Sequence, residues 1–314
     1  MALLRFAVLR SRARRPLVYV GVSVSVLLLF CAWASLDRRE KSDTTELALK
    51  ACVLEELEET SRPWASFVRI VNHCVAEHTE LLSGGSDFFD LNMGRYGEKK
   101  YFLPFADEAR RGEECSWLTV GIGGDDQVER EFHEKYPACR IYGIEPQADQ
   151  AANFASVGTV INLAAGVEPS SLPMNVRIDK KYAFKTMPVV PLDEIVKERM
   201  HTERVHFATM DIEGFEYALL TALENDRRFT KNGISFCQID AEMHQWKKTR
   251  KWRSEGLDTF YDFFRSLMLY SDMVPIHAAN FLYHKKVTLV NVGDEECVEL
   301  FGLSRVMMAE TEEE

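Results

Sequence analysis

The chain has 314 residues, of which 46% are hydrophobic and 28% are charged. This composition is typical of a folded protein and argues against a disordered one, and the length suits one large domain or a domain with a stem. A formal net charge of −11 argues against the broad basic surface that contacts phosphates, so no nucleic-acid partner is expected.

The amino terminus has the pattern of a membrane anchor. Residues 1–15 form a basic tail with five arginines and no acidic residue, and residues 16–36 contain no charge. An apolar segment of about twenty residues is long enough to cross a bilayer as a helix. Because the arginines outweigh the basic residues that follow the segment, the tail is expected to stay in the cytosol. The sequence therefore predicts a transmembrane signal-anchor and a type II protein of the secretory pathway, with its main domain on the lumenal side of the ER or Golgi.

Two other interpretations of the amino terminus stay open. Ala32, Trp33 and Ala34 fit a signal-peptidase site, so the segment could instead be a cleaved signal peptide of a secreted protein. An arginine-rich start without acidic residues also occurs in mitochondrial presequences, but the membrane-length segment that follows argues against one. The anchor and the signal peptide both place the main domain outside the cytosol.

Six of the seven cysteines lie outside the apolar segment, and none has the spacing of a zinc site. On the lumenal side these six could form disulfides in any of fifteen pairings, and buried free thiols are the alternative. The six are Cys52, Cys74, Cys115, Cys139, Cys237 and Cys297.

Residues 37–100 are expected to form a stem and a helical amino-terminal region ahead of the main domain at residues 101–314. Apolar residues recur at three- and four-residue spacing across residues 46–57 and 63–82, which is typical of amphipathic helices. Residues 83–86 then interrupt the pattern as a loop.

From about residue 115, short apolar segments alternate with helical ones. Strands are predicted at residues 116–122, 140–144, 159–163, 205–210 and 234–239, with helices at 126–136, 147–154, 191–200 and 217–224. A helix at 258–269 precedes two strands, at 273–277 and 286–292, whose short connection indicates an antiparallel pair. This order predicts an α/β, Rossmann-like doubly wound sheet that is mostly parallel and has an antiparallel edge strand.

Ligands of doubly wound sheets bind beyond the carboxyl ends of the strands, near the point where the strand order reverses. The first predicted strand is followed by Gly121 and Gly123, and glycine permits positive φ angles and close approach of a ligand. Glu145 follows the second strand, 24 residues after Gly121. At about this spacing a carboxylate can accept both hydroxyls of a ribose.

The fourth and fifth strands also end in polar residues. Three carboxylates surround a glycine at residues 211–216, an arrangement that is costly to bury unless it binds something. Alternation along the fifth strand places Glu242 and His244 on one side. We therefore expect Asp211, Glu242 and His244 to converge beside the glycine loop.

Five segments resemble the FkbM-type methyltransferase domain in their order and spacing. They lie at residues 144–146, 162–164, 191–195, 210–216 and 239–244, and the resemblance covers about residues 115–245. The sequence departs from the family's first loop, because Thr119 replaces a usual acidic residue and Asp125 replaces a usual glycine.

The resemblance implies that the chain uses S-adenosylmethionine for O-methyl transfer. Gly121 and Gly123 would then contact the methionine part of this cofactor, and Glu145 would bind its ribose. Asn162 and Ala164 would lie near the adenine. Asp211 would lie where the cofactor meets the acceptor.

Methyl transfer to a hydroxyl needs a base for the hydroxyl proton. His244 is the first candidate, with Glu242 or Asp211 next, and a purely structural histidine is the alternative. No metal is expected, although Asp211 and Glu242 could hold magnesium as carboxylates do in some small O-methyltransferases.

The expected partner is the hydroxyl of a glycan or small-molecule metabolite, by analogy with other sugar-modifying enzymes that are anchored behind a stem. A catalytically inactive methyltransferase-like binding protein is the alternative, since the first loop departs from the family. A nicotinamide dehydrogenase is disfavoured, because Asp126 stands where the last glycine of its fingerprint is required.

Overall fold

The structure is a computed structural model that describes residues 44–81, 87–93, 97–107, 114–178, 181–248 and 257–307. The predicted basic tail, residues 1–15, and the predicted anchor, residues 16–36, lie outside the described residues. Of the helices in the described ranges, none combines the length and apolar character needed to cross a membrane.

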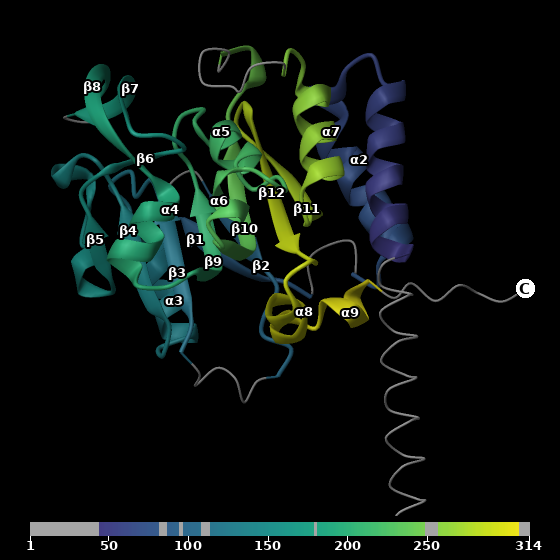
Figure 1. The fold of residues 1–314 in the computed structure, drawn as a ribbon, viewed down its shortest axis with the longest axis horizontal. Helices are drawn as coiled ribbons and strands as arrows, with labels where there is room; N and C mark the ends of the chain where they lie inside the picture. Colours follow the sequence, from purple (N-terminus) through teal and green to yellow (C-terminus); the bar gives the residue numbers. More distant parts are fainter. Residues whose placement is uncertain are drawn as a thin grey trace, which may run out of the picture.

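A seven-stranded sheet forms the centre of the protein, in the order β11-β12-β10-β9-β3-β4-β5 (Figure 1). The five strands from β10 to β5 are parallel, and β12 and β11 continue the sheet antiparallel at one edge. The predicted sheet with an antiparallel edge is therefore confirmed. Its strands are β3 (Ser116–Val120), β4 (Arg140–Ile144), β5 (Thr159–Ile161), β9 (Arg204–Met210), β10 (Ser235–Met243), β11 (Met273–Phe281) and β12 (His284–Asn291).

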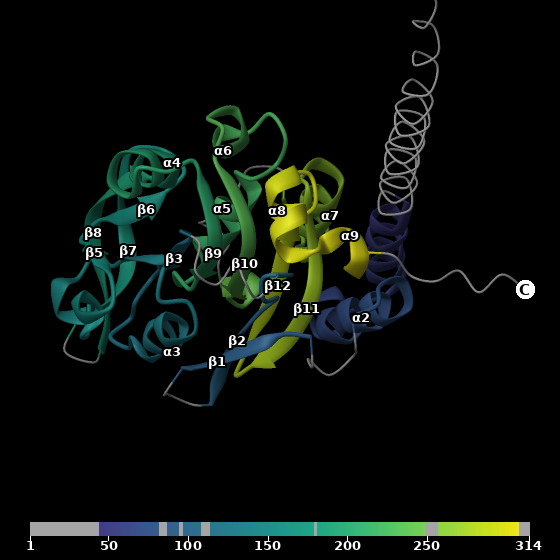
Figure 2. The same cartoon turned by 90° about the horizontal axis from the view of Figure 1, so that it is seen from below.

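Four of the five helices predicted between residues 126 and 269 are found, and three further short helices were not predicted. The observed helices are α3 (Gln127–Lys135), α4 (Leu192–Ile195) continuing as the π-helix Val196–Met200, α5 (Glu216–Thr221), α6 (Arg228–Lys231), α7 (Phe260–Tyr270), α8 (Glu295–Phe301) and α9 (Leu303–Val306). The helix α7 begins with a capping box, in which Thr259 and Asp262 satisfy each other's backbone N–H groups. Figure 2 shows α3 on one side of the sheet and α4 and α6 on the other.

The helix predicted at residues 147–154 is wrong. The chain instead forms two short 3₁₀ turns, Ala148–Gln150 and Phe154–Ser156. Ala152 between them has a φ of 50°, which is incompatible with a continuous right-handed helix. Because Phe154 is the only buried residue of the two turns, no apolar face is available to stabilise a helix there.

Two small sheets were not predicted. A hairpin of β1 (Phe89–Met93) and β2 (Glu98–Phe102) packs on the same side of the main sheet as α3 (Figure 2). The second small sheet contains β6 (Ala164–Gly166), β7 (Ser170–Ile178) and β8 (Lys181–Pro191).

The amino-terminal helices belong to the same hydrophobic core as the sheet. Residues 44–59 are helical and precede α2 (Pro63–His78), and α2 packs against β11. Phe67 of α2 contacts Phe264 of α7 edge-on, with ring centroids 4.9 Å apart. The core is one continuous cluster from Leu49 to Met307. The predicted domain boundary at residue 100 falls inside β2.

The six cysteines outside the apolar segment are all paired. Cys52–Cys74 joins the first helix to α2, Cys115–Cys139 joins the start of β3 to the start of β4, and Cys237–Cys297 joins β10 to α8. Of the two interpretations that the sequence left open, disulfides rather than free thiols are therefore found.

Candidate active site

The carboxyl ends of β3 and β9 meet at the point where the strand order reverses. Val120 pairs with Met210, and the Asp211 N–H donates to the Val120 carbonyl at 3.0 Å. Gly121 has a φ of 95°, and a Cβ at this position would lie 2.1 Å from the Asp211 carbonyl oxygen. Glycine is therefore required at residue 121 so that the two strand ends can pack closely.

A hydrogen bond joins Gly123, which follows β3, to Glu145, which follows β4. The Gly123 N–H donates to Glu145 Oε2 at 3.1 Å, and Glu145 Oε1 accepts from the Gln147 N–H at 2.9 Å. Burial raises the pKa of Glu145, while these two N–H groups act in the opposite direction. A Cβ at Gly123 would meet no described atom within 4 Å. This glycine thus borders open space beside a carboxylate, which is compatible with a bound ligand.

Asn162 and Ala164 lie after β5, but in different surroundings. Asn162 is exposed, and its Nδ2 donates to the Glu145 carbonyl at 3.2 Å. Ala164 is buried in a small apolar cluster with Val189 and Phe215. Asn162 is therefore accessible to a ligand, whereas Ala164 is buried and is not.

His244 is surrounded by carboxylates from the turn after β9. Its Nδ1 lies 3.2 Å from Glu216 Oε1, and its Nε2 lies 3.5 Å from Glu213 Oε2 and 3.8 Å from Asp211 Oδ1. Burial disfavours the charged ring, but Glu216, then Asp211 and Glu213, outweigh it and raise the pKa of His244 to about 10. A protonated imidazole donates hydrogen bonds and has no lone pair to accept a proton. The role of general base for His244 stays a prediction, and it would require this proton to leave first.

Glu242 completes the group of residues that was expected to converge. It is 4% exposed, and its Oε2 has no hydrogen-bond partner within the described part of the chain. Burial and the nearby Asp211 carboxylate raise the pKa of Glu242 to about 9. Burial also raises the pKa of Asp211. The structure therefore brings Asp211, Glu242 and His244 together at the carboxyl edge of the sheet.

This geometry agrees with a comparison of the sequence with protein families. The model of the methyltransferase FkbM domain matches residues 73–283, about two thirds of the chain. The chain belongs to the FkbM methyltransferase family. The match includes the Gly123–Glu145 contact and the turn after β9, so the sequence resemblance is confirmed. A search of curated proteins finds no match to the chain.

The match begins within α2 and thus includes the hairpin that was not predicted. We call the group formed by Asp211, Glu213, Glu216, Glu242 and His244 the acidic edge. Beneath it, this hairpin contributes to a buried ionic cluster. Glu98 lies 2.8 Å from Lys100 and 2.7 Å from Lys286, and Lys286 lies 2.8 Å from Asp240. Burial opposes ionisation of Glu98, but the two lysines hold its pKa at about 2. Burial alone would lower the pKa of Lys100, but the charges of Glu98 and Asp240, and then of Asp211 and Glu242, raise it well above its usual value.

The carboxyl group of Glu129 lies next to Thr119, one of the two positions at which the sequence departs from the family. Thr119 donates a hydrogen bond to Glu129 of α3 and accepts one from Trp117 Nε1 at 2.8 Å. Burial raises the pKa of Glu129 to about 7. Helix α3 thus places a carboxyl group next to the position where the FkbM family usually has an acidic residue.

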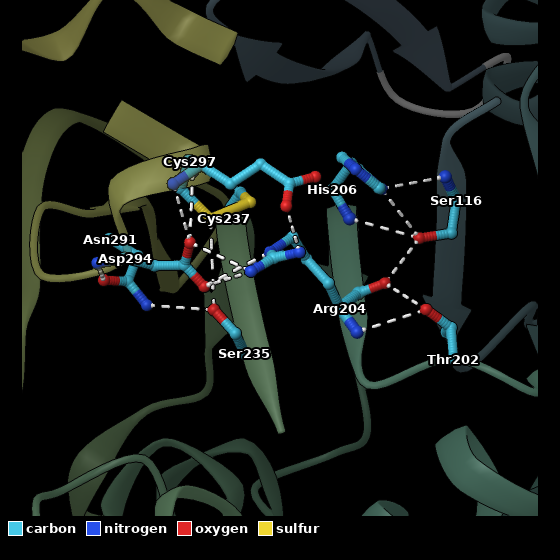
Figure 3. A network of polar contacts seen from close by, with 10 residues as sticks. Ser116, Thr202, Arg204, His206, Ser235, Cys237, Asn291, Asp294 and Cys297 are labelled. Atoms are coloured by element: carbon cyan, nitrogen blue, oxygen red, sulfur yellow. Dashed lines mark hydrogen bonds and ion pairs between the residues drawn. A yellow bond between two sulfur atoms is a disulfide. The ribbon is translucent and has the colours of Figure 1, made fainter. Parts of the chain in front are cut away.

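A hollow of about 600 Å³ lies at the opposite, amino-terminal edge of the sheet. Arg204, Ser235 and Asp294 are among its lining residues (Figure 3). Arg204 is paired with Asp294 at 3.2 Å and with Glu296 at 2.5 Å. Because its cation is already paired and the residues of the acidic edge are absent, we do not assign the reaction to this hollow.

Proposed function

We propose that the chain is an S-adenosylmethionine-dependent O-methyltransferase that acts on a hydroxyl of a glycan or small metabolite. The observation that carries the proposal is the Gly123–Glu145 contact beside Asp211, at the reversal of strand order. Membership of the FkbM family supports methyl transfer as the reaction class.

The residues present suit this cofactor. Glu145 provides carboxylate oxygens for the ribose hydroxyls, and Gly123 borders the space beside them. The acidic edge and the ionic cluster beneath it contain more carboxyl groups than cations, which favours binding of a positively charged ligand. Glu242 adds no charge near pH 7 because of its raised pKa; the other carboxyl groups belong to Glu98, Asp211, Glu213, Glu216 and Asp240, and the cations to Lys100, Lys286 and His244. When bound, S-adenosylmethionine supplies an electrophilic methyl group on a positively charged sulfur.

We propose that Asp211 is the base that removes the proton of the acceptor hydroxyl. Its side chain is 30% exposed, whereas Glu216 is fully buried and Glu242 is nearly so. An acceptor entering from solvent can therefore reach the Asp211 carboxylate, whereas Glu216 and Glu242 are covered. The role of the protein is then to hold the hydroxyl oxygen in line with the methyl group and to remove its proton.

We also propose that the domain acts on the lumenal or extracellular side, held by residues 16–36 as a type II anchor. Three disulfides support this, because such bonds persist in oxidising compartments and are rare in the cytosol. Protease treatment of sealed microsomes tests the orientation, since a lumenal domain is digested only after detergent is added. Digestion without detergent would contradict it. A cleaved signal peptide would appear as a mature chain that begins near residue 35.

The reaction is tested by incubating the full-length chain with methyl-labelled S-adenosylmethionine and pools of hydroxylated glycans and metabolites. Label transferred by the wild type, and reduced about 100-fold or more in Asp211→Asn, would support the proposal. Cofactor binding without transfer to any pool would favour the inactive, binding-protein alternative.

A further inference from the structure

We propose that Glu242, His244 and His284 form a site for one divalent transition-metal ion of the zinc type. One carboxylate oxygen and two imidazole nitrogens, one from each residue, all lie within 4.8 Å of one another. Two other groups of this kind in the described residues both use Cys52, whose sulfur is bonded to Cys74, so they are not metal sites.

The three side chains are placed by two hydrogen-bonded strands. Glu242 and His244 are two residues apart along β10 and its end, so they point to the same side. Met243 pairs with Lys285 of the antiparallel strand β12, which brings the first residue of β12, His284, beside His244. The two imidazole rings have centroids 4.3 Å apart. Ligands held on adjacent strands are positioned before an ion arrives.

Glu216 prepares His244 for this role. Its Oε1 lies 3.2 Å from His244 Nδ1, and its Oε2 accepts from the Gly214 N–H at 2.9 Å. Histidines that bind metals commonly donate their other ring N–H to a carboxylate, which fixes the tautomer and the ring orientation. With Nδ1 directed to the fully buried Glu216, His244 Nε2 is the nitrogen left to bind the ion, which would displace the proton that the ring carries in the metal-free protein.

Glu242 supplies a second, independent observation. Its Oε2 has no hydrogen-bond partner in the described ranges, although the residue is only 4% exposed. A buried carboxyl oxygen without a partner is costly, and a bound cation that displaced the Glu242 proton would satisfy it. Asp211 and Glu213 face His244 from the neighbouring turn and add negative charge that favours a divalent ion.

The ligand set selects the kind of ion. Two histidines and one glutamate are a common set in catalytic zinc sites, which keep a further position open, whereas magnesium and calcium prefer oxygen ligands alone. Bonds of about 2.0–2.1 Å place tetrahedral ligand atoms roughly 3.4 Å apart. Shifts of the three ligand atoms by about 1 Å, through side-chain rotation, would therefore close the site. This differs from the carboxylate-only magnesium site that the sequence suggested at Asp211 and Glu242.

The role of the ion rests on the proposed function, although its binding does not. An acceptor hydroxyl at the open position would be polarised by the cation and would lose its proton more readily, and Asp211 lies nearby to receive that proton. The ion would thus act on the acceptor, while Gly123 and Glu145 hold the cofactor.

Zinc binding to the full-length chain, without an affinity tag and stripped of metal by chelator, tests the site. Calorimetric titration with Zn²⁺ should give one ion per chain, and Mg²⁺ should give no comparable signal. His284→Ala should weaken Zn²⁺ binding at least about 100-fold and Glu216→Gln about 10- to 100-fold, whereas His73→Ala, an exposed histidine of α2, should leave it unchanged.

No binding of Zn²⁺ by the folded wild type, or equal binding by His284→Ala, would overturn the proposal. If His284→Ala does not fold, the visible spectrum of wild-type chain loaded with Co²⁺ decides, because a closed nitrogen–oxygen site gives ligand-field bands and free Co²⁺ in solution gives only very weak ones. Cofactor binding is measured separately. Zn²⁺ binding without S-adenosylmethionine binding supports the metal site and contradicts the proposed reaction, and the reverse result contradicts the metal site alone.

Discussion

His244 and Glu216 are in contact twice, although 28 residues separate them in the sequence. Glu216 Oε1 accepts from the His244 backbone N–H at 2.7 Å and lies 3.2 Å from the ring Nδ1. The Tyr217 hydroxyl donates to the His244 carbonyl, so the first two residues of α5 bind both the backbone N–H and the carbonyl of His244. The acidic turn after β9 and the end of β10 are therefore coupled as one unit.

This coupling predicts unequal effects of two glutamate substitutions. Glu216→Gln removes a fully buried charge from its ion pair and should lower the free energy of unfolding by about 3 kcal/mol. Glu213→Gln, whose side chain is 30% exposed, should cost less than about 1 kcal/mol. Urea unfolding at pH 7 in the presence of chelator measures both. Equal losses would show that Glu216 does not hold the site together.

Gly121 of the first loop and Gly233, which lies between α6 and β10, should respond differently to a methyl group. Gly233→Ala introduces only a side chain at positive φ and should cost about 1 kcal/mol. Gly121→Ala adds a collision with the Asp211 carbonyl, so its cost should exceed that of Gly233→Ala by about 2 kcal/mol. Thermal unfolding of both variants compares them, and equal costs would contradict the close packing of the two strand ends.

Gly123→Ala should weaken binding of S-adenosylmethionine without an added cost to the stability of the fold. Its Cβ enters the space beside Glu145, so the stability cost should match that of Gly233→Ala, whereas affinity for S-adenosylmethionine should fall about tenfold or more. Unchanged affinity would place the cofactor elsewhere.

His206 should make the fold sensitive to mild acid. Burial, and then the charge of Arg204, lowers the pKa of His206 to about 4, and the ring accepts from the Ser116 N–H at 3.1 Å (Figure 3). Because the unfolded state takes up this proton near pH 6.5 and the folded state only near pH 4, stability is lost as the pH falls through that interval. Between pH 7 and pH 5 the loss amounts to about 2 kcal/mol.

Comparison of the wild type with His206→Asn at these two pH values measures this contribution. The asparagine retains a hydrogen-bond acceptor but does not titrate, so the pH-dependent loss should be smaller by about 2 kcal/mol. An identical pH dependence in the two proteins would show that His206 is not a buried neutral histidine.

The disulfide that ties β10 to α8 should contribute substantially to stability. Cys237 and Cys297 are 60 residues apart, and opening a loop of this size costs about 2–5 kcal/mol. The Cys237→Ser/Cys297→Ser double variant should lose this amount in urea unfolding. Peptide mapping without reduction should recover the pair, and finding free thiols at both positions would contradict it.

The main sheet and the convergence of Asp211, Glu242 and His244 could be predicted because both follow from local patterns. Apolar segments of strand length mark the parallel strands, and the carboxyl ends of such strands necessarily meet at one edge. The contact of Gly123 with Glu145 follows from the same rule. These features depend on the order of elements along the chain rather than on details of packing.

The parts that were missed depend on contacts between distant segments. Glu98 and Lys100 belong to a charged segment that resembles exposed surface. Their burial depends on the ion pair of Glu98 with Lys286 of β12, which is itself paired with Asp240 of β10. His284 follows two exposed residues in a turn, and only the antiparallel register of β10 and β12 brings it to His244. No periodicity in the sequence encodes such pairings.

Titration of the full-length chain with S-adenosylmethionine by calorimetry tests the central claim most directly. The wild type should bind one molecule per chain with micromolar affinity, and Glu145→Gln should weaken binding at least about tenfold through loss of the ribose-facing charge. Glu114→Gln, an exposed glutamate at the other edge of the sheet, should bind like the wild type. A folded wild-type protein that does not bind, or a Glu145→Gln variant that binds as tightly as the wild type, would contradict the cofactor site on which the proposed function depends.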